Sequence, residues 1–321
     1  MQREIPIGLC AGLAAALLMV VQTTGSLFGL LLGIFAALPI TLVSLGWSYR
    51  AGLTAAASAV AVICVVCSLR LGLTFGVATA LPAWALAYLA TERNADAPAK
   101  WLPLGAIVLV ACVLAAFGFL FTMHATAGSY EAALDQFVSS LTTLLHVYLN
   151  QPQDQPLVLP DVPDTASFVR SVARFAVPFQ TMLFAIVSLC GLWLSARIML
   201  VSGRLSRPWP DIAALRLPSM GLAIVTIAGV ALLLLPDLAG VVGQFLLAAL
   251  FTALFVQGLA VLHFMTRGMA GRTFILGMTY PLCIILGSIT MPLIALLGLA
   301  EQIFVFRDRS QNTARPLPPH S

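Results

Sequence analysis

Residues 102–123, which read LPLGAIVLVACVLAAFGFLFTM, decide the class of fold. This stretch contains no charged residue, and a helix needs about 20 mostly apolar residues to cross the hydrocarbon core of a bilayer. The rest of the chain has the same character, because 60% of its 321 residues are hydrophobic and 9% are charged. A soluble domain carries about 25% charged residues, and a disordered chain has low hydrophobicity. The sequence therefore excludes both classes and indicates a membrane protein.

Nine apolar stretches of this kind follow one another along the chain. They are Ile5–Val21, Leu27–Trp47, Ala51–Leu69, Leu71–Ala90, Leu102–Met123, Val172–Leu200, Met220–Leu235, Leu238–Met265 and Phe274–Ala300. Because lipid offers no hydrogen-bond partners to exposed backbone groups, such stretches must be helices that pack together. We expect an all-α, polytopic transmembrane helical bundle of eight to nine membrane segments, formed by one domain over residues 1–306.

The distribution of arginine and lysine predicts the orientation of the bundle. With a cytoplasmic N-terminus, the cytoplasmic loops contain most of the basic residues, and the outer loops contain Arg70, Arg170 and Arg174. The bilayer is then expected to be a bacterial inner membrane. The last stretch contains Pro281 and Pro292, which bend or break a helix. We expect it to be broken or re-entrant, so that residues 307–321 form a short disordered tail in the cytoplasm.

The long loop 124–170 is predicted to lie outside and to contain one amphipathic helix. From Tyr130 to Leu149, apolar residues recur at steps of three and four, as at Leu134, Phe137 and Leu141. This spacing places them on one helix face, with polar residues on the other. The helix is expected to lie on the outer membrane surface or to cover the bundle as a lid.

Several kinds of chemistry are not supported by the sequence. It contains no G-x-x-x-x-G-K-[ST], H-E-x-x-H or G-x-S-x-G motif. Cys64 and Cys67 form C-x-x-C inside an apolar run, where packing is the simpler explanation. The basic residues are scattered, which is not typical of nucleic-acid binding. We expect no enzymatic activity, no cofactor, no metal and no nucleic-acid partner.

Four uncharged polar residues in the spans are candidates for lining a solute cavity: Gln180, Gln244, Gln257 and His263. Polar groups inside a membrane usually face the bundle interior and often bind a substrate. Hydrogen bonding between helices is the alternative, and the sequence leaves both open.

Small residues four apart are candidates for close helix contacts. Gly25, Gly29 and Gly33 share one helix face, which allows a neighbouring backbone to approach. They are expected to pack within the chain or against a partner membrane protein.

Three further stretches resemble a known family. Residues 38–53 read LPITLVSLGWSYRAGL, residues 297–307 read LGLAEQIFVFR and residues 257–263 read QGLAVLH. They are similar to the YybS-like family of bacterial polytopic membrane proteins, which is distantly similar to the substrate-binding S components of energy-coupling-factor transporters. The resemblance implies a partner membrane subunit with an ATPase module, and docking through small residues of the first helix, here Ala11 and Ala15.

Two functions follow from these patterns. The first is a transporter-like membrane protein that binds or moves a small solute, of unknown identity, together with a partner energising module. The alternative is a non-transporting scaffold or assembly factor that packs against partner membrane proteins.

Overall fold

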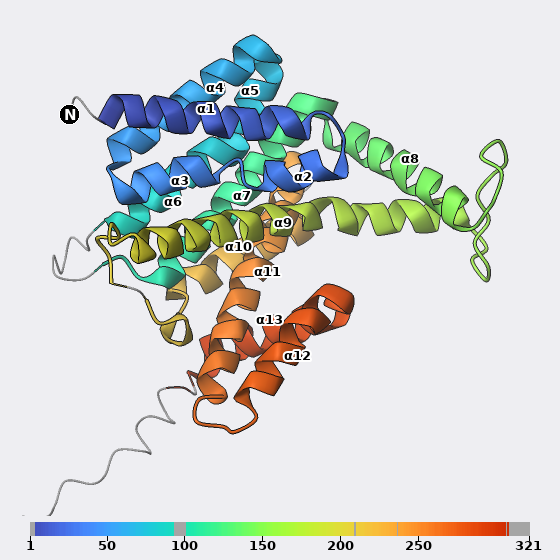
Figure 1. The fold of residues 1–321 in the computed structure, drawn as a ribbon. Coiled ribbons are helices and arrows are strands. Elements are labelled where there is room, and N and C mark those ends of the chain that lie inside the picture. Colours follow the sequence, from blue (N-terminus) through green and yellow to red (C-terminus); the bar gives the residue numbers. More distant parts are fainter. Residues whose placement is uncertain (1–3, 93–100, 209, 236, 306, 308–321) are drawn as a thin grey trace, which may run out of the picture.

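The computed structural model describes residues 4–92, 101–208, 210–235, 237–305 and 307, and the elements in these ranges are all helices (Figure 1). Within them, eight stretches are long and apolar enough to cross a membrane: Glu4–Gln22, Leu27–Gly46, Tyr49–Val66, Leu69–Thr91, Leu104–Ala127, Thr165–Val201, Ala239–Met265 and Gly287–Phe304. Two apolar helices are shorter, α10 (Ser219–Leu234) and α12 (Arg272–Ile285). The polytopic helical bundle predicted from the sequence is confirmed.

Two of the eight stretches are interrupted, and a proline explains each interruption. Leu27–Gly46 is divided into α2 (Leu27–Ile34) and α3 (Leu38–Gly46). Leu69–Thr91 consists of α5 (Leu69–Phe75), the π-helix η1 (Gly76–Ala80) and α6 (Leu81–Thr91). Proline has no N–H, and its ring crowds the carbonyl four residues earlier. Pro39 and Pro82 therefore disturb the helix at Phe35 and Ala78, where α2 ends and where η1 lies.

The N-terminal helices pack through alanine and glycine. α1 (Glu4–Gln22) lies along α4 (Tyr49–Val66), and Ala15, Ala55 and Ala59 are each fully buried in this layer. These small side chains allow the two backbones to approach closely.

The long helices α7 (Leu104–Ala127), α9 (Thr165–Val201) and α11 (Asp237–Met265) form the centre of the bundle. Their contact includes the buried residues Cys112, Ala116, Ala185 and Ala253. α9 has 37 residues, so it is about 55 Å long and exceeds the roughly 30 Å hydrocarbon core of a bilayer.

The predicted amphipathic helix is present as α8 (Tyr130–Tyr148), which runs beside the first part of α9 and away from the bundle (Figure 1). Its first half packs Leu134 against Met123 of α7 and Phe245 of α11. Arg170 on α9 donates to Glu131 at 2.7 Å and Asp135 at 2.6 Å on its polar face.

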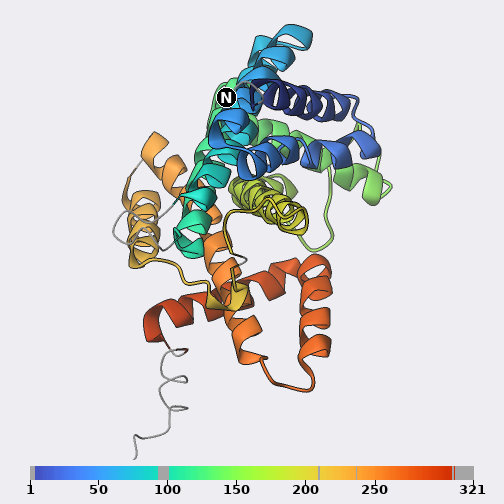
Figure 2. The ribbon, with the colours of Figure 1, turned by 60° about the vertical axis from the view of Figure 1, so that its left-hand side comes forward.

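The last apolar stretch is two helices, α12 and α13 (Gly287–Phe304), which meet at a corner (Figure 2). Both ends of this hairpin lie beside one loop. Arg267, just before α12, pairs with Asp211 at 2.5 Å, and Arg307 donates to the carbonyl of Ala213 at 2.8 Å. The start and the end of the hairpin therefore lie at the same end of the bundle, and its course relative to the membrane stays a prediction. Arg307 itself is buried, so the packed chain extends one residue beyond the predicted boundary, while residues 308–321 lie outside the described residues.

Candidate functional site

The predicted cavity residue Gln244 contacts the backbone of α9. Its amide Nε2 donates to the carbonyl of Arg174 at 3.0 Å. That carbonyl lies four residues before Pro178, which supplies no N–H to it. Gln244 therefore satisfies the carbonyl that the proline leaves free.

Gln257 is buried and joins three parts of the chain. Its Oε1 accepts from the backbone N–H of Leu217 at 2.7 Å, and its Nε2 donates to the carbonyl of Gly298 at 2.8 Å. The same Nε2 lies 3.0 Å from Oε1 of Gln302. This side chain is a structural cross-link between α11, α13 and the loop before α10.

The other two predicted residues lie elsewhere. His263 Nε2 is 2.8 Å from the Tyr280 hydroxyl, which links α11 to α12, and Gln180 is half-buried on α9. Gln244 and Gln257 are thirteen residues apart on α11, about 20 Å along the helix. The four residues occupy separate helix contacts, and none of them lines either cavity described below.

The predicted docking residues have several roles inside the chain. Ala15 is fully buried against α4, and Ala11 packs on the same cluster. A Cβ at Gly29 would lie 2.4 Å from the carbonyl oxygen of Val21, and one at Gly33 would lie 2.2 Å from Oε1 of Gln22, so both allow α2 to approach α1. Gly25 has a φ of +67° and forms the turn between these helices.

A cavity of about 190 Å³ lies where the two interrupted spans meet α1 and α9; we call it the midspan cavity. It is lined by Gln22, Gly33, Ile34, Ala37, Ala78, Thr79, Leu183, Phe184, Val187 and Ser188. The π-helix that carries Thr79 lies close to α7. Gly118 on α7 allows this approach, because a Cβ at that position would lie 2.9 Å from Cα of Ala78. Both proline-induced interruptions therefore contribute walls to one cavity.

Three polar side chains from three elements line the midspan cavity: Gln22, Thr79 and Ser188. All three are half-buried, and within the described residues none of their side chains forms a hydrogen bond with the protein. Several other hydroxyls in the spans donate to a carbonyl three or four residues earlier, as Thr74 and Thr122 do, although the buried Thr252 does not. A polar group without a partner is costly in a membrane, so these three require water or a ligand.

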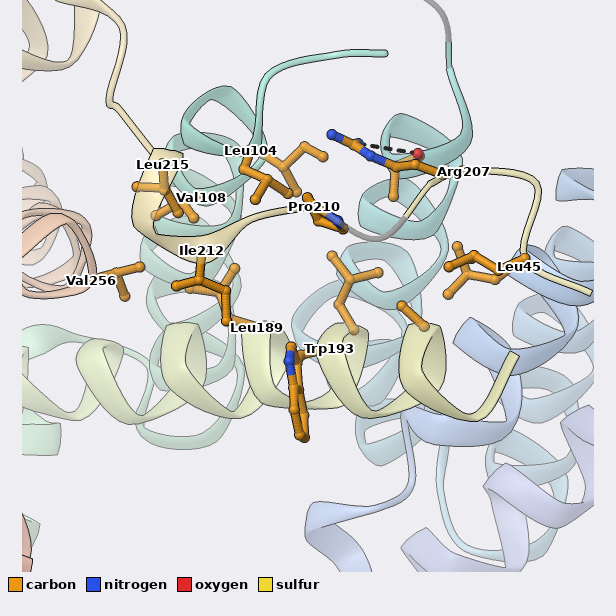
Figure 3. A pocket seen from close by; sticks show the side chains of 15 residues that line it. Leu45, Leu104, Val108, Leu189, Trp193, Arg207, Pro210, Ile212, Leu215 and Val256 are labelled. Carbon is orange, nitrogen blue, oxygen red and sulfur yellow. Dashed lines mark hydrogen bonds between the residues drawn. The ribbon is translucent and has the colours of Figure 1, made fainter. Parts of the chain in front are cut away.

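A second cavity, of about 210 Å³, lies between α7, α9 and the loop that follows α9 (Figure 3); we call it the arginine cavity. It is lined by Leu45, Ala90, Leu104, Ile107, Val108, Leu189, Leu192, Trp193, Ala196, Leu205, Arg207, Pro210, Ile212, Leu215 and Val256. Of these described residues, Arg207 is the one that carries a charge. The walls are otherwise apolar.

Arg207 is held by backbone oxygens. Its Nη1 donates to the carbonyl of Ala90 at 3.3 Å, and its Nη2 donates to the carbonyl of Leu102 at 2.9 Å. Burial lowers the pKa of the guanidinium from its usual value, although an arginine stays protonated in proteins. The cavity thus combines an apolar interior with one fixed positive charge.

The lid predicted from the amphipathic pattern is not over either cavity. No residue of α8 lines them, and the apolar residues of its first half pack against α7, α9 and α11. Leu144, Val147 and Tyr148 in its second half remain exposed. The sequence predicted this helix correctly, but it did not predict which helices it packs against.

Sequence reasoning missed Gln22, Thr79, Ser188 and Arg207. Pro82 was the available signal for Thr79, because it predicts a disturbed helix three to four residues earlier. Gln22 and Ser188 have no comparable local signal. Arg207 appeared in the sequence only as one of many loop arginines.

The apolar spans and their helical packing define a polytopic helical membrane protein. Residues 13–301 match the family described as predicted membrane protein (DUF2232), and the chain belongs to this family. No curated protein and no solved structure matches the chain. The resemblance to YybS-like proteins and to energy-coupling-factor S components stays a prediction.

Proposed function

We propose that this membrane protein binds a small, uncharged polar solute in the midspan cavity. The observation that carries the proposal is the set of three side chains without protein partners, Gln22, Thr79 and Ser188. An amide and two hydroxyls both donate and accept hydrogen bonds and carry no charge. A neutral solute with hydroxyl, amide or carbonyl groups complements them.

The backbone around the cavity supports the same proposal. Transporters commonly bind substrates where membrane helices are discontinuous, and π-helical turns are frequent at functional sites. Here the α2–α3 interruption and η1 border one cavity. Because the lining residues include no carboxylate, imidazole or thiol, we propose a binding role and not a catalytic one.

We also propose that the solute enters from the exterior side. Gln22 is the last residue of α1, at the end of the bundle toward which α8 extends (Figure 1). The arginine distribution supports an orientation with that end outside a bacterial inner membrane and the N-terminus in the cytoplasm. Movement of the solute would then depend on a partner subunit with an energising module.

The test is the accessibility of cysteines introduced into the cavity, in a variant without the six native cysteines. Thr79→Cys and Ser188→Cys are treated with a water-soluble methanethiosulfonate reagent in membranes. Thr181→Cys is the matched control, because Thr181 is on the same helix as Ser188, is fully buried and donates to the Pro178 carbonyl at 2.6 Å. Both cavity cysteines should react faster than the control. Equal rates at all three positions would show that the cavity is not hydrated and would reject the proposal.

A scaffold role is the second candidate, and the paired polar residues favour it. Gln244, Gln257 and His263 hydrogen-bond to neighbouring elements in a closed bundle. A mild-detergent pull-down of the tagged protein from its membrane separates the candidates. Recovery of a transmembrane subunit with ATPases supports solute transport, whereas recovery of envelope or biosynthetic machinery without an ATPase supports the scaffold.

A further inference from the structure

The arginine cavity is a second site, formed by residues that the midspan cavity does not use. Figure 3 shows Arg207 in the upper part of the view and Trp193 at the bottom, with Pro210 between them and the apolar side chains Leu104, Leu189 and Ile212 to the left. Trp193 is 50% exposed on α9, so this side of the cavity reaches the outer surface of the bundle. An apolar molecule in the membrane can approach from this side.

Arg207 differs from two other arginines that contact the same loop. Arg267 and Arg307 each pair with a carboxylate, Asp211 and Glu301 respectively. Within the described part of the chain, Arg207 pairs with no carboxylate and binds only the two carbonyls given above. A guanidinium has five N–H donors, so donors remain after these two hydrogen bonds.

A half-buried cation is most stable beside an anion, and arginine binds carboxylates and phosphates through a planar pair of donors. We propose that the arginine cavity binds an amphiphile with an acyl chain and an anionic head. The chain occupies the apolar interior between α7 and α9, and the carboxylate or phosphate head contacts the Arg207 guanidinium. The α9 residues of the cavity, from Leu189 to Ala196, lie in the last part of this helix, where we expect a charged head to reach water.

The experiment measures ligand binding to the full-length protein by native mass spectrometry from a non-ionic detergent. The probes are palmitate, palmitoyl lysophosphatidate and hexadecanol, which share a chain length and differ in the head. Palmitate or lysophosphatidate should bind about tenfold more tightly than hexadecanol, because a hydrogen bond to a charged group contributes this much. If one anionic probe binds and the other does not, that head identifies the ligand. Equal binding of all three probes overturns the proposal.

Arg207→Gln should remove the preference for an anionic head, and Arg207→Lys should retain part of it. Arg204→Gln is the matched control, because Arg204 is in the same loop, lies over the Trp47 ring at 4.5 Å and does not line the cavity. Ala196→Phe should weaken all three probes by filling the cavity. If Arg207→Gln and Arg204→Gln bind the probes alike, or if Ala196→Phe binds them as the wild type does, the proposed site is wrong.

Discussion

Arg307 is the largest fully buried side chain in the described part of the protein. Its Nε donates to Glu301 at 2.7 Å, and its two Nη atoms donate to the carbonyls of Ala213 and Leu215 at 2.8 and 3.0 Å. These contacts fasten the end of α13 to the loop that forms one wall of the arginine cavity. The residue is the first of the tail 307–321 that the sequence predicted to be disordered, and its partners Ala213 and Leu215 are 94 and 92 positions away in sequence.

Removing one partner of this pair should destabilise the protein strongly. Arg307→Met leaves the Glu301 carboxylate buried without a partner, and breaking a buried ion pair in this way costs about 3–5 kcal/mol. The double variant Glu301→Gln with Arg307→Met should be more stable than Arg307→Met alone, because it buries no unpaired charge. The free energy of unfolding, from SDS titration in mixed micelles, measures both effects. If Arg307→Met lowers the free energy of unfolding no more than Arg204→Gln does, the buried ion pair does not stabilise the protein as proposed.

At the scale of helices, glycine determines which pairs of spans lie in contact. A Cβ at Gly12 would lie 1.9 Å from Ser58 Oγ and 2.5 Å from the Ala55 carbonyl oxygen, both on α4. At the α11–α13 crossing, a Cβ at Gly258 would lie 1.8 Å from the Ile294 carbonyl oxygen. No side chain fits at either position without moving a backbone, so these glycines fix the approach of the helices.

Gly12→Val should therefore separate α1 from α4. Overpacking of this kind typically costs about 1–3 kcal/mol. Gly191→Ala on α9 is the matched control, because no atom outside its own helix segment lies within 4 Å of the added Cβ, and it should stabilise the helix by about 0.5–1 kcal/mol. Unfolding in the same SDS assay compares the two variants. If both glycine replacements changed stability in the same direction, close packing of α1 on α4 would not be the cause.

At the scale of the whole molecule, the position of the hairpin α12–α13 predicts which loops share a side of the membrane. Its two ends lie against the loop after α9, whereas α8 extends from the opposite end of the bundle (Figures 1 and 2). Ser202 and Thr273 should therefore lie on one side and Ser139 on the other. If the arginine distribution gives the orientation, as the sequence predicts, Ser139 should face the exterior.

Single cysteines at these positions, in a variant without native cysteines, test the arrangement in bacterial cells. A membrane-impermeant maleimide should label Ser139→Cys in intact spheroplasts. It should label Ser202→Cys and Thr273→Cys only after the membrane is permeabilised. Labelling of Thr273→Cys from outside, with Ser202→Cys protected, would contradict the placement of these two loops on one side of the membrane.

Several elements were predictable from local pattern alone. The amphipathic helix was expected from Tyr130 to Leu149 and ends one residue earlier, at Tyr148. The single apolar stretch Leu27–Trp47 is divided at Phe35, four residues before Pro39. The predicted cavity residues are present in the spans, but three of the four hydrogen-bond to neighbouring elements.

The sequence by itself determined the class of protein, the positions of its spans and the amphipathic helix. Hydrophobic runs suffice for this, because a lipid environment forces each apolar stretch to satisfy its own backbone as a helix. Only the tertiary structure decided which polar side chains pair and which face a cavity. Gln257 hydrogen-bonds to the backbone of Leu217 and Gly298. Gln22, Thr79 and Ser188 instead line one cavity, and their side chains have no hydrogen-bond partner in the described part of the protein. Such contacts join residues far apart in the chain, and they depend on helix positions that no local pattern specifies.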